Sequence, residues 1–345
     1  MNIAHLLPYS AQFPLVKHNG RYEWVLRLAQ AQARTGNTVS IYCAPGSSDP
    51  SSQIAWRTAP HDFRDKSLNN ISLIQTALQN SHDIYHSHFD YIHYFLADTT
   101  NKPFIYTQHW FPNQNFAHAA EYNKTQNVLA IPVTQLMHAE NKKLGLPTSD
   151  TIYHGIDLDQ FQLNTAPRQN RLIFIGRIAP HKGVHLAVQA ALDAGAQLDI
   201  VGKIQPQDEA YWQTILPHVD GQQIRYLGPR PHSDIPALFA QAKALIFPSQ
   251  ASESFGLVTV EAQACGTPVI ISDIGASSEL VVHGKTGYIC KTPDDYQAAI
   301  GKVHTLSPAD CRTNAERFSL DAMVKSYENL YTKLASQPAP SPGQL

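Results

Sequence analysis

Short apolar runs alternate with amphipathic stretches along most of the chain. Residues 2–8 form an apolar run typical of a buried strand, and residues 38–43 form a second one. Between them, apolar residues recur at helical spacing up to Gly36, namely Tyr22, Val25, Leu26, Ala29 and Ala33. Strand, loop, helix and strand in this order predict a βαβ unit, which favours a parallel, doubly wound sheet.

The alternation continues and then restarts after a polar stretch. Further strands are predicted near 83–86, 102–107, 128–131, 150–153, 172–175, 198–201, 224–227, 243–247 and 268–271, and helices near 66–79, 184–192, 294–304 and 320–335. The polar stretch 164–170 separates the two series. We therefore expect an α/β protein with two Rossmann-like domains over 1–165 and 166–318, a last helix over 319–335, and a disordered tail over 336–345.

Composition excludes several classes of protein. Hydrophobic residues make up 43% of the chain and charged residues 16%, which is typical of a globular protein. The 26 Lys and Arg residues face 28 Asp and Glu residues, so no basic field indicates nucleic acid. His86, His88 and His93 are close in sequence, but no zinc motif accompanies them. The four cysteines are far apart and are expected to be reduced core residues.

The N-terminus and the apolar runs bear on localisation. Met1 leads directly into a strand without a basic leader, and no apolar run reaches the length of about 18 residues that a membrane span needs. We expect a cytoplasmic protein, with peripheral contact at the inner membrane face left open.

Residues 247–268 carry the strongest candidate site. The pattern predicts a strand end at Phe247, a loop, and a helix from Leu257 that ends at 266–268, with Ser252 or Ser254 as its cap. On one continuous helix, Glu253 and Glu261 would lie about 12 Å apart along the axis and point roughly 80° apart. A glycosidase needs its carboxylates about 5–9 Å apart, so this spacing is better suited to gripping two parts of one elongated ligand. The alternative is a capping Glu and a solvated helix Glu.

Basic residues and glycines follow several predicted strands. Arg177 and Lys182 stand at a strand-to-helix turn, where they would suit a diphosphate, although ordinary surface charge is the alternative. Gly20, Gly202 and Arg230 also lie in loops at the carboxyl edge of a predicted sheet, the edge where such folds bind ligands. Two such edges imply a cleft between the domains.

Two histidines, His88 and His109, sit just past predicted strands. For His88 a satisfied loop or core histidine is the more probable role, whereas for His109 that role and a functional one are evenly balanced.

These motifs together resemble glycosyltransferase family four. The resemblance rests on residues 176–183, on the Glu-x7-Glu pair of Glu253 and Glu261, on His154-Gly155-Ile156-Asp157, and on residues 279–287. It implies a GT-B fold and a retaining, metal-independent glycosyltransferase without a cofactor. The family's last helix crosses back onto the N-terminal domain, which 319–335 would do here.

The resemblance also implies roles for individual residues. Arg177 and Lys182 would bind the donor diphosphate, Glu253 the donor sugar and Glu261 the ribose, while His109 would lie near the reacting centre. Ser254, Phe255, Gly256 and Leu257 would meet the sugar and phosphate, Gly20 the phosphates, and the loops of Gly202 and Arg230 the base. The family often has Gly-Gly-x-Glu where this chain has Asn19-Gly20-Arg21-Tyr22, which puts the contacts of that loop in doubt.

The substrates and the reaction remain open at this stage. A UDP-sugar is the favoured donor, with GDP-mannose second, and the acceptor would be a sugar, a lipid-linked group or a small molecule. A nucleotide-sugar epimerase of similar shape, or a two-domain ligand-binding protein without turnover, are the alternatives. The oligomeric state is not indicated.

Overall fold

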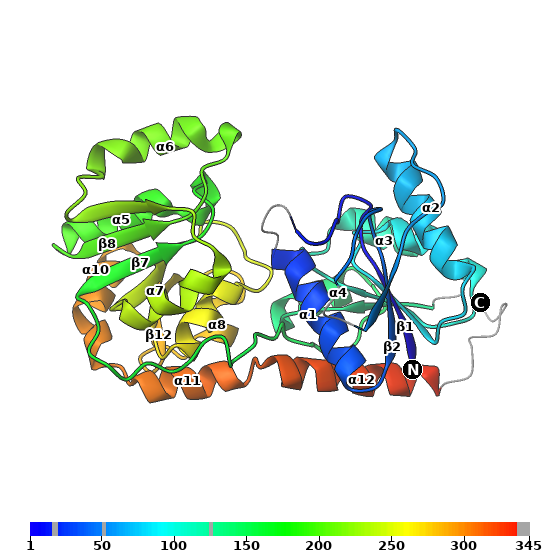
Figure 1. The fold of residues 1–345 in the computed structure, drawn as a ribbon. Coiled ribbons are helices and arrows are strands. Elements are labelled where there is room, and N and C mark those ends of the chain that lie inside the picture. Colours follow the sequence, from blue (N-terminus) through cyan, green and yellow to red (C-terminus); the bar gives the residue numbers. More distant parts are fainter. Residues whose placement is uncertain (16–19, 50–52, 124–126, 337–345) are drawn as a thin grey trace. The chain divides into compact units, whose positions relative to one another are not determined.

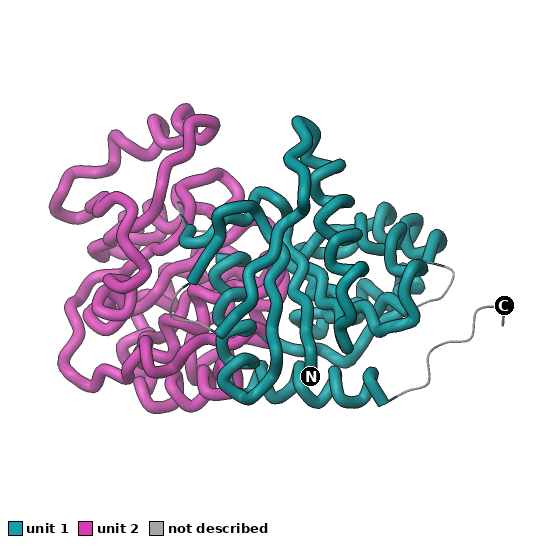
Figure 2. The backbone as a smooth tube through the Cα atoms, turned by 45° about the vertical axis from the view of Figure 1, so that its right-hand side comes forward, with its two compact units in different colours: residues 1–153, 321–345 teal, residues 154–320 magenta. Residues whose placement is uncertain are grey.

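The computed structural model describes residues 1–15, 20–49, 53–123 and 127–336 (Figure 1). These residues form two compact units, each with its own parallel sheet (Figure 2). Unit 1 comprises Met1–Tyr153 and Asp321–Leu345, and unit 2 comprises His154–Leu320. The predicted tail, 337–345 in particular, lies outside the described residues.

Unit 1 is built on a six-stranded sheet with the strand order β3-β2-β1-β4-β5-β6. Its strands are β1 (Asn2–Leu6), β2 (Thr38–Tyr42), β3 (Ile54–Arg57), β4 (Ile84–Ser87), β5 (Phe104–Thr107) and β6 (Val128–Ile131). Its helices are α1 (Gly20–Arg34), α2 (Lys66–Leu78), α3 (Gln114–Ala120), α4 (Gln135–Lys143) and nearly all of α12 (Leu320–Ala335). All five pairings are parallel, as the alternating pattern predicts.

Unit 2 repeats this topology. Its sheet has the order β12-β11-β10-β7-β8-β9, which is the order of unit 1 once the strands are counted from β7. Its strands are β7 (Arg171–Ile175), β8 (Gln197–Val201), β9 (Ile224–Gly228), β10 (Ala244–Phe247), β11 (Val269–Ser272) and β12 (Gly287–Cys290). Its helices are α5 (Val184–Asp193), α6 (Glu209–Ile215), α7 (Ile235–Gln241), α8 (Leu257–Ala264), α9 (Ser277–Leu280), α10 (Pro293–Lys302) and α11 (Pro308–Glu316).

Each sheet therefore has one point at which the strand order reverses. In unit 1 this switch point lies between β1 and β4, and in unit 2 it lies between β7 and β10. Loops that leave neighbouring strands in opposite directions open a crevice at such a point, and ligands of doubly wound folds bind there. The topology thus selects the loops after β1, β4, β7 and β10 as the places to look for chemistry.

The boundary between the units differs from the one expected at residue 165. The segment 154–165 is polar in sequence, but it packs within unit 2. Phe161 is fully buried, its carbonyl accepts a hydrogen bond of 2.6 Å from Arg312 Nη1, and the Asn164 amide donates to the Cys265 carbonyl at 3.3 Å. Backbone bonds also join Ile156 to Phe318 and Leu320, at 2.9 and 2.8 Å. The polar composition predicted a boundary too far along the chain. One buried aromatic side chain and these backbone hydrogen bonds make 154–165 part of unit 2.

Most helices and strands agree with the pattern, and the exceptions are instructive. The last helix covers Leu320–Ala335, as expected, and its buried residues Met323, Val324, Tyr327 and Tyr331 lie on one stripe. Residues 150–153, by contrast, form no strand. The four cysteines are free and buried, as expected.

Candidate functional site

The loops that leave β7 and β10 meet at the switch point of unit 2. After β7, a short 3-10 turn over Pro180–Lys182 and Gly183 lead into α5, and after β10 the chain runs through Ser249 and Glu253 to α8. Both helices begin at this edge of the sheet, so their first amides carry partial positive charge toward it. This edge can therefore attract an anion before any side chain is considered.

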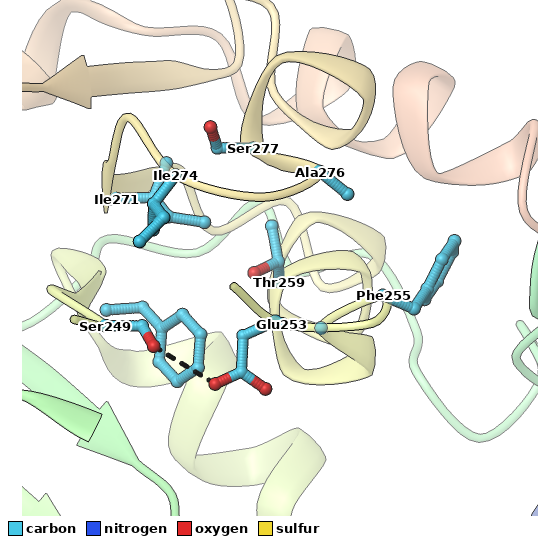
Figure 3. A pocket seen from close by; sticks show the side chains of 10 residues that line it. Ser249, Glu253, Phe255, Thr259, Ile271, Ile274, Ala276 and Ser277 are labelled. Carbon is cyan, nitrogen blue, oxygen red and sulfur yellow. Dashed lines mark hydrogen bonds between the residues drawn. The ribbon is translucent and has the colours of Figure 1, made fainter. Parts of the chain in front are cut away.

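Lys182 and Glu253 form an ion pair at this edge. Lys182 Nζ lies 2.6 Å from Glu253 Oε1, and the two side chains are only 20% and 25% exposed. The Ser249 hydroxyl lies 3.1 Å from the same carboxylate oxygen, as Figure 3 shows. The ammonium also lies 5.7 Å from the centre of the Phe247 ring. A pair this sheltered holds both charged groups in a defined place while leaving them accessible to a ligand.

Arg177 contacts His181, the residue before Lys182, and is more exposed than the pair. Its guanidinium is 3.2 Å from His181 Nε2, and its Nε is 3.8 Å from the Asp208 carboxylate. The pKa of His181 is lowered by burial and by the nearby positive charges of Arg177 and Lys182. The imidazole therefore remains neutral at pH 7, and the two cations dominate this side of the site.

Two glycines bring the loops of the site close together. Gly183 has φ +72°, and a Cβ added there would lie 1.9 Å from the Pro248 carbonyl oxygen. Gly202 faces the Gly176 carbonyl, where an added Cβ would lie 1.8 Å from the oxygen. Gly183 thus allows the Lys182 turn to touch the loop that carries Glu253. Gly202 packs so closely against Gly176 that it has no room for a side chain. The packing alone therefore explains this glycine, independently of the donor contact that the sequence predicts.

Glu253 and Glu261 do not share a helix. Helix α8 begins at Leu257, so Glu253 lies in the loop before it and the helical spacing computed for the pair does not apply. The expected cap by Ser252 or Ser254 is also wrong. The N-cap is Gly256 in a left-handed conformation, φ 94°, which a serine side chain would strain.

Glu261 has a partner that the sequence did not indicate. It lies on α8, is 9% exposed, and its carboxylate is 3.2 Å from His232 Nε2. A buried carboxylate held by a histidine at a sheet edge is a suitable acceptor for paired hydroxyl groups.

The remaining predicted residues of this loop differ in exposure. The Phe255 side chain is 2% exposed and packs against His154 and Phe318, so only its backbone can meet a ligand. Ser254, Gly256 and Leu257 are half-buried, and Arg230 is exposed.

A small pocket lies beneath the loop. Its lining includes Gly256 together with Glu253, Thr259, Ile274 and Ser277, and the last four are labelled in Figure 3. The Thr259 hydroxyl is buried and has no hydrogen-bond partner among the described residues. An unsatisfied hydroxyl beside Glu253 marks this as a polar position that a ligand or water would improve.

In unit 1, the predicted residues lie at the carboxyl edge of the first sheet. Gly20 is the first residue of α1, and an added Cβ there would meet no atom within 4 Å, so neither packing nor conformation requires a glycine. His88 follows β4 and is fully buried, whereas His109 follows β5 and is half-buried. Asn19 of the same motif lies outside the described residues.

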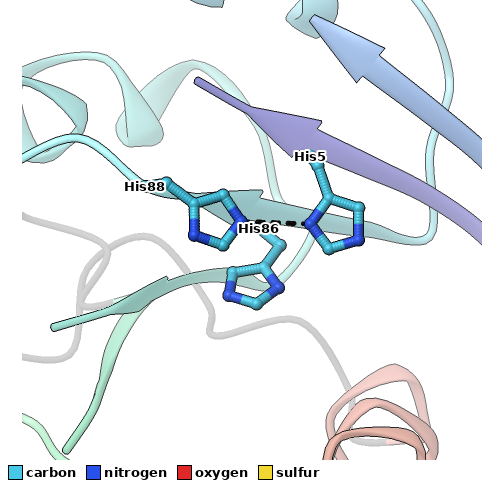
Figure 4. A group of neighbouring side chains, drawn as sticks. All are labelled: His5, His86 and His88. Atoms are coloured by element: carbon cyan, nitrogen blue, oxygen red, sulfur yellow. Dashed lines mark hydrogen bonds between the residues drawn. The ribbon is translucent and has the colours of Figure 1, made fainter. Parts of the chain in front are cut away.

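Sequence reasoning missed Ser249, Asp208 and His232. All three lie in loops after strands at the carboxyl edge of unit 2, which is a usable signal. Their pairing with Glu253, Arg177 and Glu261 depends on loop paths that no periodicity specifies. Among the described residues, one group of three possible metal ligands exists, His5, His86 and His88 in unit 1 (Figure 4).

Comparison with solved structures defines the class of fold. Sucrose-phosphate synthase of Thermosynechococcus elongatus aligns over 97% of this chain and 99% of its own, with a TM-score of 0.78 and 20% identity. HepE of Anabaena, solved in complex with UDP, aligns over 97% and 100%, with a TM-score of 0.79 and 19% identity. At this identity the likeness concerns the fold, which is the two-domain α/β GT-B fold of glycosyltransferases.

Comparison of sequences shows similarity to glycosyltransferases. Residues 155–318 match the model described as Glycosyl transferases group 1. Glycogen synthase of Mycobacterium tuberculosis is 34% identical over 160 residues, which are 44% of this chain and 38% of that protein. D-inositol 3-phosphate glycosyltransferase of a Mycobacterium species is 27% identical over 271 residues, which are 68% and 62% of the two chains. These matches agree with the resemblance to glycosyltransferase family four.

The chain spans only part of the length of these curated relatives. The aligned part spans only 38% of the first of these curated relatives and 62% of the second. Separately, none of the described helices is long and apolar enough to cross a membrane.

Proposed function

We propose that this protein transfers a glycosyl unit from a nucleotide-sugar, with a UDP-sugar favoured and GDP-mannose second, to a hydroxyl of a sugar, lipid-linked or small-molecule acceptor. The observation that carries the proposal is the sheltered ion pair of Lys182 and Glu253, 2.6 Å apart at the switch point of unit 2, with Arg177 beside it. The match of residues 155–318 to the glycosyl transferases group 1 model supports the same conclusion.

In this proposal Lys182 and Arg177 bind the diphosphate of the donor. Their positive charges, together with the amides at the starts of α5 and α8, stabilise the negative charge that develops on the leaving phosphate as its bond to the anomeric carbon breaks. Because two cations and two helix N-termini supply this charge, no metal ion is needed. Glu253 holds hydroxyl groups of the donor sugar, and Glu261 holds those of the ribose.

The transfer is proposed to retain the anomeric configuration. The acceptor oxygen forms its bond to the anomeric carbon on the face from which the phosphate departs, and the acceptor proton passes to a phosphate oxygen of the leaving diphosphate. No nucleophile of the protein takes part. Catalysis then rests on charge stabilisation and on positioning of the two substrates.

The choice of UDP for the first experiments comes from HepE, which was solved with UDP and with UDP-glucose. A thermal-shift panel of UDP, GDP, ADP and their sugars would show which nucleotide base the protein binds. A ligand at 100 times its dissociation constant stabilises the folded state by about 2.7 kcal/mol, which is readily measured.

Variants of the ion pair test the activity. Lys182→Met and Glu253→Gln should each lower donor-dependent transfer by ~10²-fold, the scale for loss of one electrostatic contact in the transition state. Lys285→Met is the matched control, because Lys285 is 61% exposed and pairs with Asp310 on the surface. Wild-type turnover in both site variants would refute the assignment.

Incubation with donor alone separates the alternatives. Release of an epimerised sugar without an acceptor would indicate a nucleotide-sugar epimerase. Tight binding of a donor with no product under any acceptor condition would indicate a ligand-binding protein.

A further inference from the structure

A groove lies at the amino edge of the unit 2 sheet. Asn170, Lys243 and Pro268 line it, and each directly precedes one of three adjacent strands, β7, β10 and β11. Lys182 and Glu253 lie in the loops that follow β7 and β10, at the carboxyl edge of the same sheet. Since a strand as short as β10 already spans about 13 Å, this groove is separate from the candidate site, and we call it the amino-edge groove.

The amino-edge groove has room for a small organic molecule. Its volume is about 490 Å³, and sites for small molecules commonly measure about 300–1,000 Å³. All of its lining residues belong to unit 2, so it forms within one compact unit. Part of the lining is apolar and is made by Pro268, Val303, Leu306 and Pro308. An organic group can therefore pack in the groove beside a charged one.

The charged side chains that line the groove are all basic. Arg168 and Lys243 carry positive charges at pH 7, and His304 adds an imidazole. Within the described part of the chain, no Asp or Glu contributes to the lining. The whole chain has a formal net charge of -2, so this excess of positive charge is local. A concave surface with one sign of charge attracts ions of the other sign.

Arg168 is a half-buried cation whose hydrogen-bonding capacity is only partly used. Its Nη2 donates to the carbonyl oxygens of Cys265 and Asn164, at 3.3 and 3.5 Å. Its Nη1 and Nε have no hydrogen-bond partner among the described residues, and no carboxylate there forms an ion pair with it. Burial lowers the pKa of Arg168, and the groups that oppose this effect are the thiols of Cys265 and Cys311. A partly desolvated guanidinium without a carboxylate is stabilised by an anionic ligand.

Lys243 is the second cation of the groove. The backbone holds this residue in place, because its amide donates to the Arg171 carbonyl at 2.7 Å, at the start of β7. The side chain is half-buried, and its Nζ makes no ion pair or hydrogen bond with any residue that the structure describes. Asn170, next to Arg171, adds an exposed side-chain amide. The groove thus offers an ammonium, a guanidinium and an amide, which can bind a phosphate and the hydroxyl groups near it.

We propose that the amino-edge groove is a second ligand site of unit 2, which binds a small organic phosphate monoester through Arg168 and Lys243. Such a phosphate carries about −1.5 to −2 charges at pH 7, which matches two cations, whereas a carboxylate or a phosphodiester carries a single charge. The organic part of the ligand packs against the apolar lining and meets the Asn170 amide. The site does not depend on the proposed function, because it lies at the other edge of the sheet.

A purely structural role of Arg168 is the competing interpretation. Cys265 is the C-cap of α8, and a cation near the last carbonyls of a helix is favourable. Only Nη2 takes part in that contact, and the contact gives no role to Lys243. Variants of Lys243 therefore separate the two interpretations, because they leave the contact with α8 intact.

Calorimetric titration of the full chain at pH 7.5 tests the site with three probes, ribose 5-phosphate, mannose 6-phosphate and glycerol 3-phosphate. The titrations use the Lys182→Met variant, in which the carboxyl edge has lost a cation that could bind phosphate there. We expect at least one probe to bind saturably, and ribose, mannose and sulfate to bind at least about 10-fold more weakly. If no probe binds at about 10 mM, or if sulfate binds as tightly as the best probe, the proposal is overturned.

Further variants in the same background locate the bound phosphate. Lys243→Met should weaken binding by about 10-fold or more, the scale for loss of one charge-assisted hydrogen bond. Lys291→Met is the matched control, because it removes the same charge in unit 2 from a side chain that is 75% exposed and pairs with Asp273. Equal affinity in these two variants would overturn the proposal. Arg168→Lys keeps a cation near α8 but loses the planar fork, so it should also bind more weakly, and unchanged affinity there would refute the role of Arg168.

Failure of this site and failure of the proposed function give different results. If a phosphate probe binds and Lys243→Met weakens its binding, while no nucleotide-sugar is bound or consumed, the proposed function fails alone. If the wild type transfers sugar and Lys243→Met leaves the binding of the probes unchanged, the amino-edge groove fails alone.

Discussion

Gly183→Ala is the change that most directly tests how the site is built. The residue has φ +72°, a left-handed conformation that costs an L-residue about 1–2 kcal/mol. Its new Cβ would also lie 1.9 Å from the Pro248 carbonyl oxygen, where real contacts are not shorter than 3.0 Å. The two loops would therefore have to separate by roughly 1 Å, and a displacement of that size at reacting groups can cost ~10²-fold in rate.

The matched control is Gly195→Ala at the end of α5. Gly195 has φ +59°, and a Cβ added there meets no atom within 4 Å. This variant carries the same conformational penalty in the same unit without the collision. We expect it to lose about 1–2 kcal/mol of stability and to keep its transfer rate.

The assay compares transfer rate, UDP affinity and urea unfolding for the two variants. Gly183→Ala should lose both UDP affinity and transfer, because Lys182 moves away from Glu253, while remaining folded. If the folded Gly183→Ala protein transferred sugar as fast as Gly195→Ala, the contact between the loops would not set the geometry of the site, and the reasoning would be wrong.

Three further predictions concern stability and reactivity. Burial raises the pKa of Cys43 to about 11 and those of Cys265, Cys290 and Cys311 to about 12. A thiol reagent at pH 7.5 should therefore label the four cysteines only after unfolding. Rapid labelling of the native protein would contradict this. Asp199→Asn should destabilise the protein by about 3 kcal/mol in urea at pH 7, because Arg171 and Arg225 lose their buried partner. Burial acts to raise the pKa of Asp199, but hydrogen bonds from the two arginines outweigh it and lower the pKa. The difference in unfolding free energy between wild type and variant should therefore shrink as pH falls below 4. Burial holds the pKa of His5 at about 4 and those of His93 and His154 at about 3, so below pH 6.5 the unfolded state binds protons first and the free energy of unfolding should decline as pH falls toward these values; unfolding titrations that are flat between pH 7 and 4 would refute this.

The sequence predicted the elements whose pattern is long or strongly apolar. Helix α12 matched at both ends, since its buried residues recur at helical spacing from Met323 to Tyr331. Strand β3 was missed because its apolar run, Ile54–Trp56, is only three residues long. Helices α6 and α7 have seven residues each, too few for a helical period to stand out.

The site was predicted residue by residue but not as a geometry. The spacing of Glu253 and Glu261 was interpreted on one helix, although Gly256 ends the loop and starts the helix between them. The pair of Lys182 and Glu253 joins residues 71 apart, and the contact of His5 with His88 joins residues 83 apart. Such pairs follow from strand order, which local patterns do not contain.

The repeated topology shows that the histidines of unit 1 are not demanded by the fold. At the switch point of unit 2, the strand pairs that correspond to β1 and β4 are apolar, with Leu172 opposite Ala244 and Ile173 opposite Leu245. In unit 1 the pairing includes His5 opposite His86, both fully buried. Buried imidazoles cost free energy unless every polar atom is satisfied, whereas apolar pairs would stabilise the same sheet without that condition. The buried histidines of unit 1 are therefore side chains that the repeated topology does not require, and this is the physical reason to test His88 before any other buried residue of unit 1.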